Sequence, residues 1–185
     1  MTITPAPLAG AWIIDVEKKH DERGFFARSF CVEELGAKGL ETAIVQTNVS
    51  FNHRKGTLRG MHFQRAPFEE VKIVRCTRGA IFDVMVDLRP ESPTLGKWFG
   101  VELSEDNHRA LYIPKRFGHG FQSLTDGSEV LYMVTQYYTP AHASGLPYDD
   151  PAFGITWPLP VSVMSAADRG WKPFAGSPFA GGRTT

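Results

Sequence analysis

The side chain with the clearest chemical potential is His62, in the segment Gly-Thr-Leu-Arg-Gly-Met-His-Phe-Gln of residues 56–64. Histidine can accept a proton at neutral pH, so it is a candidate general base. If the segment is a strand, Gly60, His62 and Gln64 share one face. Polar side chains facing a barrel interior destabilise it unless they find polar partners, so this face predicts an enclosed polar site. Arg59 falls on the opposite face and joins the site only if Gly60 marks a β-bulge.

A second polar face occurs in residues 129–138, where Tyr132, Gln136 and Tyr138 alternate with outward-facing residues. Two phenols and an amide suit a ligand-filled interior, although amphipathic core tyrosines would give the same pattern. Asp168 lies in Ser-Ala-Ala-Asp-Arg, residues 165–169, and alone reads as an ordinary carboxylate near a helix start.

Metal binding is not expected. A metal-binding barrel would show a His-x-His pair with further ligands, whereas here the pair reads His62-Phe63-Gln64. Glu69 and Glu70 could offer oxygen atoms, but no set of three ligands is evident.

Many short apolar runs separated by turn residues indicate an all-β fold, either a sandwich, a jelly roll or a small barrel. In residues 81–88 the alternation puts four apolar side chains on one buried face and points Asp83 and Asp87 away from it. Short helices are expected at 32–38 and 163–170. The strands are expected at 11–15, 25–30, 43–49, 57–64, 71–76, 81–88, 97–103, 109–113, 119–124 and 129–138.

The length of 185 residues fits one domain, predicted to span 1–174, with 175–185 as a flexible tail. Twenty basic and twenty acidic residues give no net charge, which disfavours nucleic-acid binding and attachment to a membrane surface. The sequence shows no signal peptide and no membrane span. Cys31 and Cys76 have no zinc-ligand spacing and are expected to be reduced thiols, so a cytoplasmic location is predicted.

Seven segments together resemble the dTDP-4-dehydrorhamnose 3,5-epimerases, in the order and spacing of that family over about residues 8–174. This resemblance implies a cupin-type jelly-roll barrel that works as a homodimer without metal or other cofactor. It implies a nucleotide-sugar substrate, dTDP-4-dehydro-6-deoxy-D-glucose, inverted at C3 and C5 to dTDP-4-dehydro-L-rhamnose. The segments are 21–26, 56–64, 78–89, 114–121, 137–140, 149–157 and 165–169.

The matched motifs also imply roles for individual residues. His62 matches the general base, Asp168 its carboxylate partner, and Tyr132 the acid that returns a proton on the opposite face. Lys72 matches the cation near the keto oxygen, and His119 matches a residue lining the pocket. Residues matching nucleotide-binding positions, or standing beside them, are Arg23, Phe26, Arg28, Gln46, Asn48, Arg59 and Tyr138.

These roles fit the chemistry of inversion next to a ketone. A weakly acidic α-proton needs a placed base, and the enolate oxygen needs a fixed cation. A protonated phenol on the far side then supplies the new proton.

The chain departs from the family pattern at Arg28, where many relatives have a glutamate, and at Val49, Phe63, Pro147 and Tyr148. Three alternatives therefore stay open: an epimerase that inverts only one centre, a metal-dependent cupin enzyme, and a sugar-nucleotide binding protein without activity.

Overall fold

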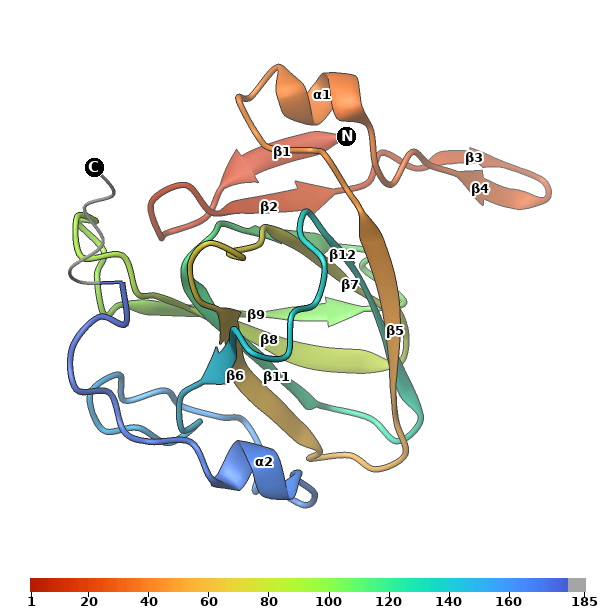
Figure 1. Cartoon of the computed structure of the whole chain (residues 1–185). Coiled ribbons are helices and arrows are strands. Elements are labelled where there is room, and N and C mark those ends of the chain that lie inside the picture. Colours follow the sequence, from red (N-terminus) through yellow and green to blue (C-terminus); the bar gives the residue numbers. More distant parts are fainter. Residues whose placement is uncertain (180–185) are drawn as a thin grey trace.

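A computed structural model of the chain describes residues 1–179 and consists mainly of antiparallel strands with two short helices (Figure 1). The elements are β1 (Thr2–Pro5), β2 (Trp12–Asp15), β3 (Lys19–Asp21), β4 (Gly24–Phe26), α1 (Val32–Gly36), β5 (Gln46–Asn52), β6 (Leu58–Gln64), β7 (Lys72–Arg78), β8 (Ala80–Asp87), β9 (Trp98–Ser104), β10 (Ala110–Ile113), β11 (Phe117–Ser123), β12 (Ser128–Val134), β13 (Ala143–Gly145) and α2 (Ala166–Arg169).

Two sheets form the body of the molecule. One has six strands in the order β1-β2-β10-β7-β12-β5, and the other has five in the order β13-β6-β11-β8-β9. A core cluster joins them, with Val74 and Leu111 from the first sheet and Met85 and Phe121 from the second. The predicted all-β jelly roll with short helices is therefore confirmed.

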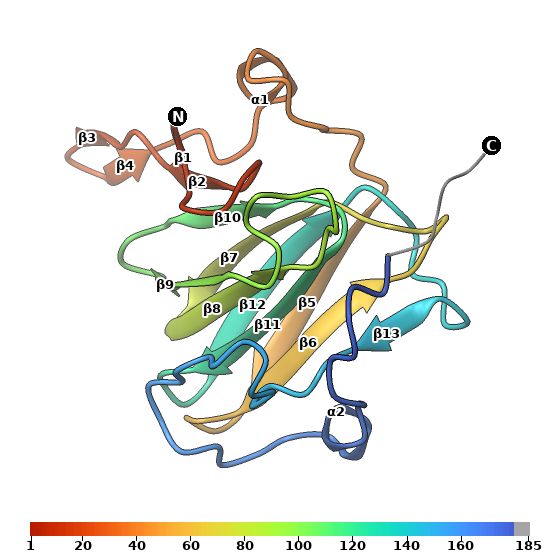
Figure 2. The same ribbon diagram turned by 90° about the vertical axis from the view of Figure 1, so that its left-hand side faces the viewer.

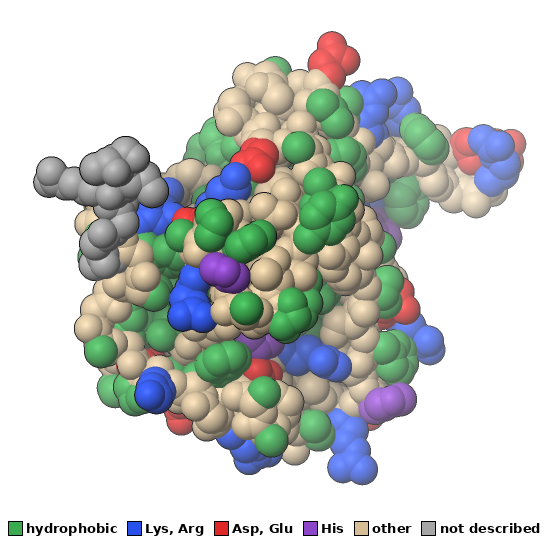
Figure 3. Space-filling model, in the orientation of Figure 1, with side chains coloured by type: hydrophobic (Ala, Val, Ile, Leu, Met, Phe, Trp, Pro, Cys, Tyr) green, Lys and Arg blue, Asp and Glu red, His purple; other side chains and the backbone are tan. Residues whose placement is uncertain are grey.

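The β3–β4 hairpin belongs to neither sheet. Figures 1 and 2 show it projecting from the body, at the end of the molecule opposite α2. Charged side chains of both signs gather at its tip in Figure 3. The predicted strand 25–30 is therefore wrong beyond Phe26, where the chain leaves the hairpin.

A bulge in β6 changes which side chains share a face. His62 pairs with His119 and Arg59 pairs with Phe121, so three steps along β6 match two along β11. This irregularity places Arg59 and His62 on the same side, as the sequence required if both serve one site. Gly60 has φ of 136°, and a Cβ there would lie 2.5 Å from Gly120 Cα, so only glycine fits.

Strand β8 is buried on both faces, which contradicts the predicted single buried face. Val84 and Val86 pack under the C-terminal segment, together with Phe153. Asp83 and Asp87 were expected to point to solvent, but both are fully buried. Side chains of β8 do alternate between two faces as predicted. The face that carries Asp83 and Asp87 meets the space between the sheets, where each carboxylate has a polar partner.

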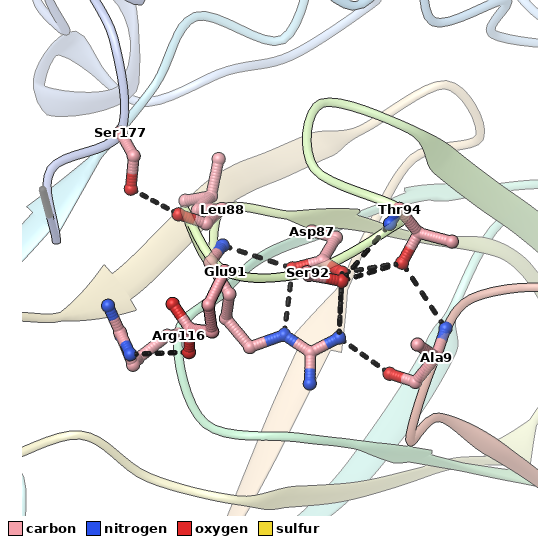
Figure 4. A network of polar contacts seen from close by, with 9 residues as sticks. Ala9, Asp87, Leu88, Glu91, Ser92, Thr94, Arg116 and Ser177 are labelled. Carbon is pink, nitrogen blue, oxygen red and sulfur yellow. Dashed lines mark hydrogen bonds and ion pairs between the residues drawn. The ribbon is translucent and has the colours of Figure 1, made fainter.

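Asp87 is the centre of a buried polar network at the 88–97 loop (Figure 4). Its carboxylate accepts hydrogen bonds from Arg89, Ser92 and Thr94. Arg89 also donates to the carbonyl oxygen of Ala9, which ties the N-terminal segment to this loop.

The C-terminal segment covers the outer face of the five-stranded sheet. Phe179 is buried against Phe63 and under the guanidinium of Arg116. The flexible tail expected at 175–185 stays a prediction, and its residues 180–185 lie outside the described part of the chain.

The outer face of the six-stranded sheet is only partly covered. Leu35 of α1 packs with Ile14 and Ile73 at one side. On β5, an edge strand, Val49 and Phe51 are exposed. Within residues 1–179, no helix is both long and apolar enough to cross a bilayer.

Candidate active site

His62 and Asp168 form a close pair although 106 positions separate them. His62 Nε2 lies 2.6 Å from Asp168 Oδ1. The imidazole is 44% exposed and the carboxylate only 6%, so the base is reachable while its partner is shielded. An ionised carboxylate only accepts hydrogen bonds, so it fixes the proton on Nε2 and leaves Nδ1 free to accept one.

A cavity of about 330 Å³ lies between β6 and the segment that leads into α2. Arg59, His62 and Asp168 are among the residues that line it. A guanidinium and an imidazole therefore meet in one cavity. In Figure 3, histidine and basic side chains lie among hydrophobic ones near the middle of the face viewed.

The Asp168 carboxylate is held by several donors. Ser165 caps α2 by accepting from the Asp168 backbone N–H, which fixes the start of the helix. Gly60 N–H and Trp171 Nε1–H donate to the two carboxylate oxygens, each at 3.4 Å. Burial alone would raise the pKa of Asp168, but these hydrogen bonds and that of His62 lower it overall. The carboxylate is therefore ionised at neutral pH.

Lys72 contacts the backbone of His62. Its ammonium donates to the carbonyl oxygen of His62 at 3.3 Å and pairs with Glu70 at 3.1 Å. Glu70 also accepts from the amide of Gln64 at 2.6 Å. The predicted cation thus contacts the backbone of His62, and Glu70, which neither pattern nor spacing had singled out for this role, holds it there.

Tyr132 lies on β12, directly opposite Asn48 of β5. Burial raises the pKa of its phenol, the charge of Arg59 lowers it, and that of Glu70 raises it further, with a net increase. Tyr132 is therefore protonated at neutral pH and lies within electrostatic reach of Arg59, which lines the cavity.

Predicted nucleotide-binding residues gather along β5. The Gln46 amide donates to Asn48 Oδ1 at 2.8 Å and accepts from the Tyr138 backbone N–H at 3.3 Å. Arg59 Nε donates to Asn52 Oδ1 at 2.8 Å, which connects β6 to β5. Strand β12 ends at Val134, so Tyr138 is not on the face of Tyr132 as expected; it is 63% exposed beside Gln46.

His119 is the strand partner of His62 and is almost fully buried. Its Nε2 lies 2.9 Å and 3.1 Å from the two carboxylate oxygens of Asp83. His119 is not among the residues that line the cavity.

Three predicted residues are far from the cavity within one chain. Arg23 and Phe26 lie on the projecting hairpin, where Phe26 is 73% exposed (Figure 1). Arg28 precedes α1 and pairs with Glu34.

Three residues that contact predicted site residues were not themselves predicted: Asp83, Glu70 and Trp171. Asp83 was misassigned because alternation reveals which residues share a face but not what covers that face. Trp171 follows α2 by two positions, a distance that could have suggested contact with Asp168, but no pattern required it.

A jelly-roll barrel with a histidine–carboxylate pair at a polar cavity is the architecture of a cupin-type enzyme. The family profile for dTDP-4-dehydrorhamnose 3,5-epimerase matches residues 5–176. The chain belongs to this family and is an isomerase of the epimerase type.

Individual relatives agree with that assignment. The dTDP-4-dehydrorhamnose 3,5-epimerase of Methanothermobacter thermautotrophicus is 47% identical over 174 residues, 92% of this chain and 93% of the relative. The dTDP-4-dehydrorhamnose 3-epimerase of Streptomyces niveus is 37% identical, over 91% of this chain and 82% of the relative. The crystal structure of the Legionella pneumophila 3,5-epimerase with dTDP-4-keto-L-rhamnose has a TM-score of 0.87 and 38% identity, covering 93% of this chain and 92% of its own.

Proposed function

We propose that the chain inverts C3 and C5 of dTDP-4-dehydro-6-deoxy-D-glucose to give dTDP-4-dehydro-L-rhamnose. The observation that carries this proposal is the His62–Asp168 pair at a cavity that Arg59 also lines. A relative with the 3,5-epimerase name and a similar structure holding dTDP-4-keto-L-rhamnose support the substrate.

In the proposed mechanism, His62 Nδ1 removes the proton next to the ketone, and Asp168 stabilises the imidazolium that forms. The ammonium of Lys72 stabilises the negative charge on the keto oxygen. Tyr132 then donates a proton to the other face of the planar enolate, which inverts the carbon. One proton leaves and one returns at each centre, so no electrons are transferred and no cofactor is needed.

The nucleoside part of the substrate is proposed to lie outside the cavity, which at about 330 Å³ is at the lower end of ligand pockets. Arg59 would bind the diphosphate, because a guanidinium offers paired donors to phosphate oxygens. Gln46, Asn48 and Tyr138 are proposed to bind the rest of the nucleotide.

We also propose that the chain acts as a homodimer in the cytoplasm. The exposed Val49 and Phe51 on edge strand β5 and the exposed Phe26 on the hairpin are surfaces that a second copy would cover. In such a dimer Arg23, Phe26 and Arg28 would complete the nucleotide site of the partner. Both cysteines are free thiols, which suits a reducing compartment.

The deciding experiment incubates the protein with dTDP-4-dehydro-6-deoxy-D-glucose in deuterated water and follows C3 and C5 by NMR. Deuterium at both carbons with inversion supports the proposal. His62→Ala should abolish exchange while dTDP affinity stays nearly intact, because the base is lost but the nucleotide contacts remain. His142→Ala, a histidine outside the cavity, is the matched control; wild-type turnover in His62→Ala would refute the mechanism.

Two alternatives give different results. Deuterium at C3 alone would indicate a mono-epimerase, the activity named for the Streptomyces niveus relative. A metal-dependent enzyme would lose activity with a chelator. Among residues 1–179, no group of three histidine, cysteine or acidic side chains is placed to hold a metal ion.

A further inference from the structure

Trp171 contacts both members of the His62–Asp168 pair. Its indole Nε1–H donates to Asp168 Oδ1, the same oxygen that binds His62. Its ring meets the imidazole of His62 edge-on, with centroids 6.3 Å apart and planes at 74°. A side chain that touches both partners can fix their relative position.

The backbone makes room for this indole. Gly145 of β13 is the strand partner of His62. A Cβ on Gly145 would lie 2.4 Å from Trp171 Cε2, so any larger residue would push the ring away. The indole of Trp171 therefore packs directly on the backbone of β13 at Gly145, the residue that pairs with His62.

Trp171 is not among the residues that line the cavity. It approaches Asp168 from α2's C-terminal side, while Gly60 N–H holds the other carboxylate oxygen. Its position is that of a support for the carboxylate rather than a contact for substrate.

We infer that Trp171 is a positioning residue, which holds the Asp168 carboxylate in line with His62 and so sets the efficiency of proton removal. This inference rests on the proposed role of His62 as the base. It predicts that the indole N–H matters for the rate of proton removal and not for nucleotide binding.

The test replaces Trp171 by phenylalanine, which keeps an aromatic ring and removes the donor. The rate of deuterium exchange into substrate should fall about tenfold, as for loss of a hydrogen bond to a charged group, with KM and dTDP affinity unchanged. Trp157→Phe is the control, since Trp157 Nε1 donates to the Tyr148 carbonyl at 2.8 Å away from the cavity. A purely structural effect would appear equally in both variants.

A double substitution separates this inference from the proposed mechanism. In an Asp168→Asn background, Trp171→Phe should change exchange by less than about twofold, because the carboxylate it supports is gone. The same tenfold loss in that background, or no loss in the wild-type background, would overturn the inference. Exchange that persists in His62→Ala would instead refute the mechanism itself.

Discussion

The proposed site depends on two side chains from distant parts of the chain, and only one of them is partly open to solvent. His62 lines the cavity and is partly exposed, while Asp168 is buried and hydrogen-bonded to three neighbours. This division lets a substrate reach the base without displacing the group that orients it. The phenol of Tyr132 is protonated at neutral pH, and burial raises its pKa further, which suits a proton donor.

Tyr132→Phe tests the role of the phenol. Inversion should fall by about 10²–10⁴, because the acid on the far face is lost. Deuterium exchange should fall less, because His62 can still remove a proton and return a deuteron to the same face. NMR in deuterated water would show exchange with retained configuration.

The control is Tyr112→Phe, which removes a buried hydroxyl that accepts from Glu41 N–H on the other side of the sheet. Equal loss of exchange and inversion in Tyr132→Phe would contradict its role as the acid.

At the level of elements, β8 illustrates what alternation can and cannot predict. The faces were assigned correctly, yet the Asp83 and Asp87 side was expected to meet solvent and is buried. Burial of a polar face needs partners from elsewhere in the chain, such as His119 and Arg89, and single-strand patterns hold no information on them. The bulge in β6 was predicted conditionally: Arg59 and His62 could share a site only if Gly60 disrupted the strand register.

For the same reason, the pattern of one strand could not predict which distant residues complete the site. His62 could be singled out from its strand, but its pairing with Asp168 was expected only from resemblance to a family. The hairpin residues Arg23 and Phe26 were assigned to the nucleotide on the same ground, and their hairpin projects from the body at the end opposite α2 (Figure 1).

Asp87→Asn should destabilise the fold by about 3 kcal/mol, because it leaves the Arg89 charge without its buried partner. Burial opposes ionisation of Asp87, but hydrogen bonds from Arg89, Ser92 and Thr94 outweigh it and lower its pKa. Its stabilising effect is therefore present above about pH 4 and is lost as pH falls through the lowered pKa.

Urea unfolding at pH 7 and below pH 4 would measure this effect, and the gap between variant and wild type should narrow in acid. Asp149→Asn, at an exposed site, is the matched control. A gap that widened in acid would contradict the assigned role of Asp87.

At the scale of the whole molecule, the projecting β3–β4 hairpin bears on whether the chain forms a dimer. It lies at the opposite end from α2 and carries the exposed Phe26 (Figures 1 and 2). Residues so placed can serve a nucleotide site only in another copy of the chain. The proposed dimer therefore predicts active sites that are shared between subunits.

Mixing two defective chains tests this sharing. His62→Ala lacks the base, and a chain with Arg23→Ala and Phe26→Ala lacks the hairpin contacts. Refolded together in equal amounts, they should regain about a quarter of wild-type activity, because half of the dimers are mixed and each has one complete site. No recovery would indicate that the hairpin serves its own chain or no site at all.

Asp168 lies in α2, which follows the last strand of the two sheets in sequence, and this order has a consequence for folding. Both sheets can be completed once β13 has been made, but His62 then still lacks its carboxylate. The segment that follows β13 must therefore dock beside β6 before the proposed base has its partner. Unfolding of that segment alone should leave both sheets intact and remove the carboxylate from His62.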